Sequence, residues 1–447
     1  MQSKRINTLF LSLAVMLVAT GLKAQRTVPL SAKEAVDFAM KNNVQVKNAI
    51  IGIAIQQQQN REITAAALPQ VDGNVAMTDY LAIPTNLLPA EFFGGAPGTY
   101  LPVKFGTKFN GSYGANLRQV LFDGQVFVGL QARTASIKYA SQNVDVTKEQ
   151  IKANVYKVYY QLVVGKVQVK ILEANISRAE KLLRDTKELF KNGFAERLDV
   201  DKVTVNISNL NTEKTKVLNQ LETGNIGLKY LMGFPVKDQV VLTDSLRDEN
   251  LKDDVLDAGD AKYDDRIEYR LLQTVSMLNK YNIKRYQMSY LPSLNLNVGY
   301  TSIAQRNTFN FFKSGEKWFP TSLFSLALNI PIFDGFARDA RIKQARLALD
   351  QTINNLADLK NNIDNEILTA KVSIRNAIIT LDEQKNNMEL AEKVYNQTKL
   401  KYEQGLGSNL EVTNAETDLT TAQNNYFSAK YDAIIAKIDY LKATGKL

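Results

Sequence analysis

The sequence predicts a mixed α and β membrane protein, in which a few strands are joined to very long helices. The same order of strands and helices occurs twice along the chain. Three observations lead to this prediction. Two long spans of the chain contain no proline, and both carry heptad patterns of apolar residues. Short segments in which apolar and polar residues alternate precede each span. A coiled coil alone does not account for such segments.

The long helices are expected between Pro102 and Pro235 and again after Pro331, where no proline interrupts the chain. In the first span, apolar residues recur in steps of four and three, which specifies a left-handed coiled-coil seam. A helix from about residue 126 to residue 190 would be roughly 100 Å long at 1.5 Å per residue. The first seam is Ile151, Val155, Val158, Leu162, Gly165, Val169, Leu172, Ile176, Ala179, Leu183, Thr186 and Phe190, and a looser one is Leu349, Ile353, Leu356, Ile363, Ile367, Ile374, Ile378, Leu381 and Met388.

The strands are expected where apolar and polar residues alternate with a period of two. This period gives a strand one apolar and one polar face. A membrane barrel needs such strands, with apolar residues toward lipid, although a half-exposed soluble sheet would show the same pattern. Residues 82–109 and 304–320 are rich in aromatics and are expected to be loops. The apolar positions are Val71, Val75, Met77, Leu117, Leu121, Leu294, Leu296, Val298, Tyr300, Leu326, Leu328, Ile330 and Ile332.

The first residues predict export. Lys4 and Arg5 precede the apolar residues 9–19, and a small-residue stretch ends at Ala24, so residues 1–24 are expected to be a signal peptide cleaved after Ala24. The alternative, a membrane anchor, needs roughly 20 apolar residues, and this run has about 11. No cysteine is present to carry a lipid. Beyond residue 24 no stretch is apolar for 18 residues, so a membrane span would have to use strands closed into a barrel.

Composition argues against catalysis. The chain contains no cysteine and no histidine, which excludes thiol nucleophiles, Ser-His pairs, disulfides and the usual zinc and haem sites. We therefore expect no catalytic residue, no cofactor and no metal. The formal net charge of +9 is spread along the helices among many acids, which is typical of a solvated surface and not of a nucleic-acid partner.

The two halves of the chain are copies of each other. The order strand, loop, strand, long helix, turn and returning helix occurs twice. If the strands cross a membrane, four per subunit are too few for a closed barrel, which needs about eight, and the subunit would then have to assemble with further copies. The matching segments are 117–124 with 328–335, 190–200 with 402–412, and Leu68-Pro69 with Leu291-Pro292.

Two pairs of junctions in the repeat have local physical roles. A Phe-Asp-Gly sequence turns each second strand into a long helix: glycine permits the bend and aspartate can cap the helix. A glycine then ends each long helix, and a leucine, an acid and a valine begin the returning helix. The strand-to-helix turns are Phe122, Asp123 and Gly124, and Phe333, Asp334 and Gly335; the helical tips hold Gly193, Leu198, Asp199 and Val200, and Gly405, Leu410, Glu411 and Val412.

These features divide the chain into expected segments. They are a signal peptide (1–24), an N-terminal helical segment (25–67), the first strand pair with an extracellular loop (68–122), the first long and returning helices (123–234), an inter-repeat equatorial segment and helix (235–290), the second strand pair with an extracellular loop (291–333), and the second long and returning helices (334–447).

Taken together, the motifs resemble the TolC family of outer-membrane efflux proteins. The resemblance is carried by the opening residues 30–43, the Leu-Pro before each first strand, the paired Phe-Asp-Gly turns and the paired helical tips, and it covers the whole chain after residue 24. It implies a homotrimer located in the outer membrane and in contact with its lipid, with a large periplasmic portion. Twelve strands would form one transmembrane barrel, continuous with a periplasmic barrel of coiled coils.

The resemblance also implies partners and a gate. The partners would be a periplasmic membrane-fusion adaptor, docking on the helical tips, and an inner-membrane pump or transporter. Asp199, Tyr402 and Glu411 would constrict the periplasmic entrance. The chain departs from the family pattern at three positions. Gln119 stands where a proline is usual, Gly407 where some members carry arginine, and Asn414 where a second acid is frequent. The acids could instead reflect the preference for acids at helix N-termini, and Tyr402 could be a core aromatic.

The function implied is that of an exit channel in a tripartite efflux or type I secretion system. Nothing in the sequence resembles a phosphate-binding loop, so energy for transport would come from the pump. The alternatives are a structural coiled-coil surface protein or adhesin, and a carboxylate-based periplasmic hydrolase. The hydrolase would need paired acids in a compact pocket, and the acids here are scattered along helices.

Overall fold

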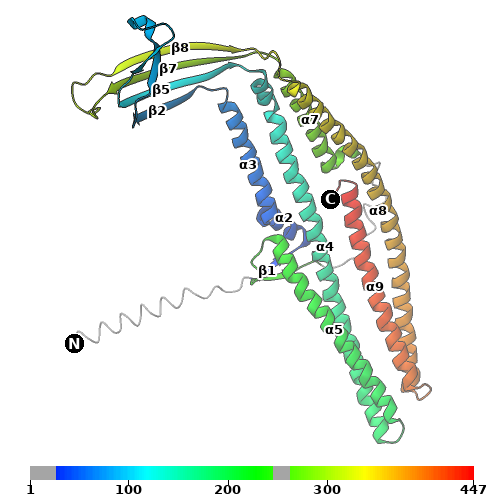
Figure 1. The fold of residues 1–447 in the computed structure, drawn as a ribbon. Coiled ribbons are helices and arrows are strands. Elements are labelled where there is room, and N and C mark those ends of the chain that lie inside the picture. The colour runs from blue at the N-terminus through cyan, green and yellow to red at the C-terminus, as the bar shows by residue number, and fades with distance from the viewer. Residues whose placement is uncertain (1–26, 245–261) are drawn as a thin grey trace, which may run out of the picture. The chain divides into compact units, whose positions relative to one another are not determined.

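The computed structural model of the chain describes residues 27–244 and 262–447 (Figure 1). The predicted signal peptide lies outside the described residues. The chain forms two compact units. We call them the helical unit, which comprises the described residues up to Gly52, Ser141–Leu271 and Leu356–Leu447, and the sheet unit, which comprises Ile53–Ala140 and Leu272–Asn355.

Four long helices dominate the chain, as the proline-free spans predict. They are α4 (Gly124–Lys191), α5 (Arg197–Met232), α8 (Ala337–Glu403) and α9 (Asn409–Ala443). In the helical unit α5 runs back along α4, and α9 runs back along α8 (Figure 1). Shorter helices are α2 (Ala32–Asn42), α3 (Val44–Ala65) and α7 (Ile267–Met288). The expected long helix between residues 126 and 190 is therefore confirmed.

The predicted seam of α4 lies against α5. Leu172 and Ala179 of α4 are buried together with Leu210 and Val217 of α5. The other side of α4 packs on α9, where Ala153 and Val164 share a second cluster of buried residues. Helix α4 thus has two apolar stripes, which explains why it carries more apolar residues than one coiled-coil seam needs.

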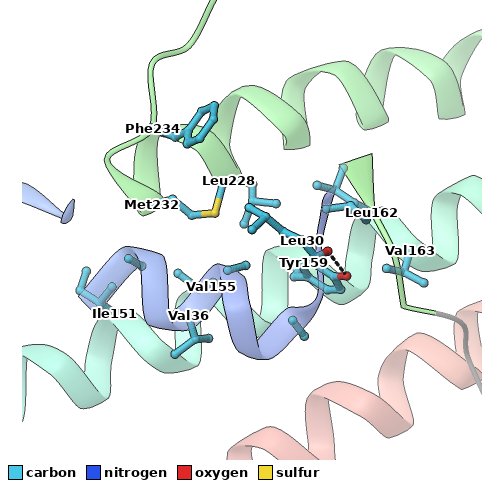
Figure 2. Close-up of a cluster of buried hydrophobic side chains, with 14 of the residues drawn as sticks. Leu30, Val36, Ile151, Val155, Tyr159, Leu162, Val163, Leu228, Met232 and Phe234 are labelled. Atoms are coloured by element: carbon cyan, nitrogen blue, oxygen red, sulfur yellow. Dashed lines mark hydrogen bonds between the residues drawn. The ribbon is translucent and has the colours of Figure 1, made fainter. Parts of the chain in front are cut away.

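A third cluster of buried residues joins the N-terminal elements to the helices. Figure 2 shows side chains of β1 (Thr27–Leu30), α2, α4 and α5 pointing toward one another. The Tyr159 hydroxyl in this cluster donates a hydrogen bond to the Leu30 carbonyl (2.8 Å) and accepts one from the Asp244 amide (3.3 Å). Burial raises the pKa of Tyr159 to about 12, so this hydroxyl remains a donor at neutral pH.

Strand β1 pairs in parallel with β6 (Gln239–Leu242), and the sequence analysis did not predict either strand. Both have four residues, which is too short for a period-two pattern to be distinguished from chance. The short 3₁₀ helix η2 (Tyr263–Asp265) precedes α7.

The sheet unit contains the predicted four-stranded sheet. Its strands are β2 (Gln70–Asp79), β5 (Phe109–Phe122), β7 (Ser293–Arg306) and β8 (Phe319–Asn329), in the order β2-β5-β7-β8 (Figure 1). Every neighbouring pair is antiparallel. The prediction of strand for Ile330 and Ile332 is wrong, because β8 ends at Asn329. Pro331 lacks the N–H that would extend the pairing with β7.

The prediction that residues 82–109 form only a loop is also wrong. This segment holds a hairpin of β3 (Thr85–Pro89) and β4 (Tyr100–Lys104), with the 3₁₀ helix η1 (Ala90–Phe93) between the two strands. The four prolines between residues 84 and 102 argued against strands. Pro89 and Pro102 are tolerated because they lie in a two-stranded hairpin, in which each strand pairs on one side only.

Among the described residues, no helix combines the length and the apolar character that crossing a membrane would require.

Replacing Tyr159 with phenylalanine should lower the midpoint of thermal unfolding, because the buried Leu30 carbonyl loses its donor. Leaving such a group unpaired costs about 1–3 kcal/mol. Tyr230→Phe is a matched control, since Tyr230 lies on α5 with 75% of its surface exposed. Equal midpoints for the two variants would contradict a structural role for the Tyr159 hydroxyl.

Candidate functional site

The register of the sheet places apolar side chains in rows on one face. Val71 of β2 lies opposite Leu117 of β5, which lies opposite Val298 of β7, which lies opposite Phe324 of β8. On the same face, Leu296 pairs with Leu326 and Leu294 with Leu328. Many of these side chains are exposed in the single chain, with 67% of Val71 and 70% of Phe324 accessible. So broad an apolar face needs a covering medium or partner.

The opposite face of the sheet is polar. The neighbouring row contains Gln70, Arg118, Asn297 and Ser325, again one from each strand. On this face the Asn116 side-chain amide donates a hydrogen bond to the Asn74 side-chain oxygen at 3.4 Å. One face suited to lipid and one suited to water are the two surfaces that a strand in a membrane pore must present.

Both edges of the sheet are open. Within the described residues, β2 pairs only with β5, and β8 pairs only with β7. Each edge therefore presents a row of unpaired backbone N–H and C=O groups, which cannot remain unpaired in lipid. The sheet is incomplete as a membrane element.

The two Phe-Asp-Gly turns begin the long helices through their aspartates. The Asp123 carboxylate accepts a hydrogen bond from the Gln125 amide (2.8 Å), and the Asp334 carboxylate accepts one from the Arg338 amide (3.0 Å). Each aspartate therefore satisfies an amide at the start of a long helix, as the sequence predicts.

The two glycines of these turns act differently, although the sequence analysis gave both the same role. Gly335 has a φ of 64°, and Phe336 follows it with a φ of 68°, in the left-handed region that a bulky side chain rarely adopts. Gly124, in contrast, does not have a left-handed φ angle. A Cβ at Gly124 would lie 2.8 Å from the Cβ of Met288 in α7, so this glycine permits a close approach of two elements.

Glycines end both long helices at the tips. Gly193 has a φ of 78°, and the Phe194 amide donates to the Leu189 carbonyl (2.9 Å). Gly405 has a φ of 76°, and the Leu406 amide donates to the Lys401 carbonyl (2.9 Å). Both turns have the bond pattern of a Schellman motif, which requires a left-handed residue at this position.

The remaining tip residues differ in exposure. Leu198 and Leu410 are 55% and 46% exposed, so each presents an apolar side chain at the start of a returning helix. Val200 is half-buried. Val412 is buried in a cluster with Tyr395, Ala415 and Leu419 and is not available at the surface of the tip.

Two of the three gate candidates, Asp199 and Tyr402, lie within electrostatic reach of each other. Tyr402 is half-buried against the cluster around Val412. Burial raises the pKa of Tyr402, and the carboxylates of Asp199 and Asp185 raise this pKa further, so Asp199 lies within electrostatic reach of the phenol. The Asp199 carboxylate also accepts a hydrogen bond from the Glu196 amide at 3.2 Å.

Glu411 is placed differently. Its side chain is exposed, and its backbone amide donates to the Ser408 hydroxyl (3.2 Å), which caps α9. A Cβ at Gly407 would lie 3.3 Å from the Glu411 carboxylate, so a side chain larger than glycine at this position would meet the acid. The same Cβ would lie 3.4 Å from the backbone nitrogen of Tyr402, so Glu411 and Tyr402 both border Gly407, although no hydrogen bond or ion pair among the described residues joins them.

Comparison with known proteins settles what kind of protein this is. The model of the family described as outer membrane efflux protein matches residues 35–234 and 277–446. The chain belongs to this family. As an outer membrane efflux protein, it is a TolC-family channel of the outer membrane that transports without enzymatic activity. The alternative interpretations as an adhesin and as a hydrolase are therefore rejected.

Individual relatives of this outer membrane efflux protein are distant in sequence. The outer membrane efflux protein BepC of Brucella suis is 22% identical over 439 residues, covering 97% of this chain and 89% of BepC. TolC of Vibrio cholerae is 20% identical over 340 residues, covering 75% of this chain and 77% of TolC. The crystal structure of CusC matches with a TM-score of 0.75 at 16% identity over 93% of this chain and 92% of CusC, which shows that the fold is shared.

A buried acid near the tips was missed by the sequence analysis. Glu416 of α9 is only 1% exposed, and its side chain accepts a hydrogen bond from the side-chain amide of Asn206 in α5 (3.3 Å). A signal was present in the sequence, because steps of four and three from Val412 pass through Glu416 and Leu419 and place the acid within a seam. No group of acids in the described part of the chain could hold a metal ion.

An arginine at Leu326 should greatly reduce the amount of protein in the outer-membrane fraction, since a basic residue facing lipid near the midplane costs about 2–4 kcal/mol. Ala327→Arg is the matched control, because Ala327 is the next residue of β8 and lies on the polar face. Equal amounts of the two variants in the membrane fraction would show that the apolar face does not contact lipid.

Proposed function

We propose that three copies of this outer membrane efflux protein form one channel, with a closed barrel of twelve strands in the outer membrane. The open edges support this proposal, because β8 of one copy can pair with β2 of the next. Two copies would supply eight strands, and the interior of such a barrel is just wide enough to be filled by side chains. Three copies are the smallest number that closes the sheet and leaves a lumen.

The polar face of the sheet would then line the lumen, and the apolar face would contact lipid. Gln70, Arg118, Asn297 and Ser325 belong to the face that would meet water. The four long helices of each copy would supply a tunnel of twelve helices through the periplasm. The segment boundaries expected from the sequence, with one strand pair and one helix pair in each half, are part of this proposal.

The partners in this proposal are a periplasmic membrane-fusion adaptor and an inner-membrane pump or transporter, which would supply the energy. The adaptor would dock at the helical tips. Leu198 and Leu410 support this placement, because both expose apolar side chains beside the turns at Gly193 and Gly405. Val200 would lie at the margin of this surface, whereas Val412 would act from inside by holding the returning helix in place.

The tips would also form the periplasmic gate. Asp199 and Tyr402 lie within electrostatic reach of each other, and Glu411 is exposed in the first turn of α9. In a trimer these groups would occur three times around the axis of the tunnel. Gly407 stands where some family members carry arginine, and Asn414 stands where a second acid is frequent. The closed gate would therefore depend on packing of Tyr402 and on the remaining acids rather than on an ion pair.

The gate is tested by the double variant Glu411→Ala with Tyr402→Phe. We expect a severalfold increase of single-channel conductance in a planar bilayer, because the variant removes a charge and a hydroxyl from the constriction. Asp418→Ala is the control, since Asp418 is an exposed acid on the same helix, two turns farther from the tip. The assignment fails if the double variant conducts like the wild type, or if Asp418→Ala gives the same increase.

A further inference from the structure

Residues of all four long helices lie around Glu416 near the tips. Glu416 belongs to α9, and its hydrogen-bond donor Asn206 belongs to α5. Arg178 of α4 and Lys399 of α8 lie close enough to act on its charge. Tyr395 of α8 is buried beside them, and the Arg178 guanidinium lies 5.5 Å from the centre of its ring. The Glu416 carboxyl group therefore lies where the four long helices pack together, and these helices would have to separate for the tips to open.

The hydrogen bonding of this cluster is incomplete. The second carboxyl oxygen of Glu416, Oε1, is buried without a hydrogen-bond partner in the described structure, and so is Nε of Arg178. The terminal nitrogen of Arg178 instead donates to Asn175, whose amide donates to Thr420 and Gln423 of α9. An acid and a base thus lie near each other without forming an ion pair. A buried carboxylate with an unpaired oxygen is costly, whereas a protonated carboxyl is tolerated.

Burial raises the pKa of Glu416 to about 7, against the opposing effects of Arg178 and Lys399. The charged and titratable groups that face it are these two bases and the phenol of Tyr395, while α5 contributes the amide of Asn206. The burial of Tyr395 raises its own pKa, with Glu416 as the next cause, which agrees with a close approach of the two groups.

We propose that Glu416 binds a proton while the four helices are packed around it as described here and releases the proton when they separate, so that protonation of Glu416 favours the closed gate. This inference rests on the proposed gate at the tips. It adds a fully buried residue to the gate candidates Asp199, Tyr402 and Glu411, and it makes opening dependent on pH.

The direction of the effect follows from proton linkage. The closed state holds the proton more tightly than an open state, in which water reaches the carboxyl and its pKa returns to the ordinary range. A falling pH therefore stabilises the closed state, and a rising pH favours opening through the neutral range. Between about pH 8 and about pH 6, the ratio of open to closed tips should fall about tenfold for each subunit.

The test measures the open probability of the full-length channel in a planar bilayer across this pH range. Glu416→Gln keeps the shape of the side chain but cannot ionise, so it should remove the pH step and hold the open probability at or below the level that the wild type shows at about pH 6. Glu416→Asp keeps an acid and should retain a step. Glu389→Gln is the matched control, because Glu389 is exposed on α8, and it should behave like the wild type.

Arg178→Gln provides a second measurement. Arg178 stabilises the ionised carboxylate, so its removal should move the midpoint of the step to higher pH. The proposal is overturned if the wild type shows no step, or if Glu416→Gln retains the step of the wild type. Failure of the gate itself has another signature, namely unchanged conductance of the Glu411→Ala and Tyr402→Phe double variant at every pH.

Discussion

The proposed channel depends on one constraint: every backbone polar group that lies in lipid must be hydrogen-bonded. The chain supplies four antiparallel strands with one apolar and one polar face, and it leaves β2 and β8 with unpaired edges. A soluble protein could leave such edges in water, but an outer membrane efflux protein cannot leave them in hydrocarbon. In the proposed channel, assembly with further copies pairs these edges.

The helical unit meets a different requirement, because its helices are too long to share one globular core. It replaces such a core with separate clusters along the helices, among them those around Leu172, Ala153 and Val412. Each cluster joins only neighbouring helices. The cluster around Val412 near the tips shares no buried residue with the cluster at Tyr159, where β1 and α2 join α4 and α5, so the proposed gate would open away from that cluster. This arrangement suits a channel whose entrance changes while its remainder stays folded.

Much of this fold could be predicted from the sequence, because long repeated patterns are strong signals. The seams of α4 and α8 extend over many residues, and the period-two pattern of β7 is regular from Ser293 to Tyr300. Short elements were missed, namely the pairing of β1 with β6 and the hairpin rich in proline. The role of Gly124 depends on Met288, which is far away in sequence, so no local pattern could reveal it. Glu416 was missed because the burial of a seam acid depends on three other helices.

Cross-linking of the open edges tests the assembly most directly. The chain has no cysteine, so a cysteine at Val75 of β2, combined with one at positions along β8, would introduce the only thiols. On oxidation in the membrane, at least one combination should give covalent dimers and trimers on a denaturing gel, with nothing larger. Only monomers for every combination along β8, or a ladder continuing beyond the trimer, would contradict a closed barrel built from three copies.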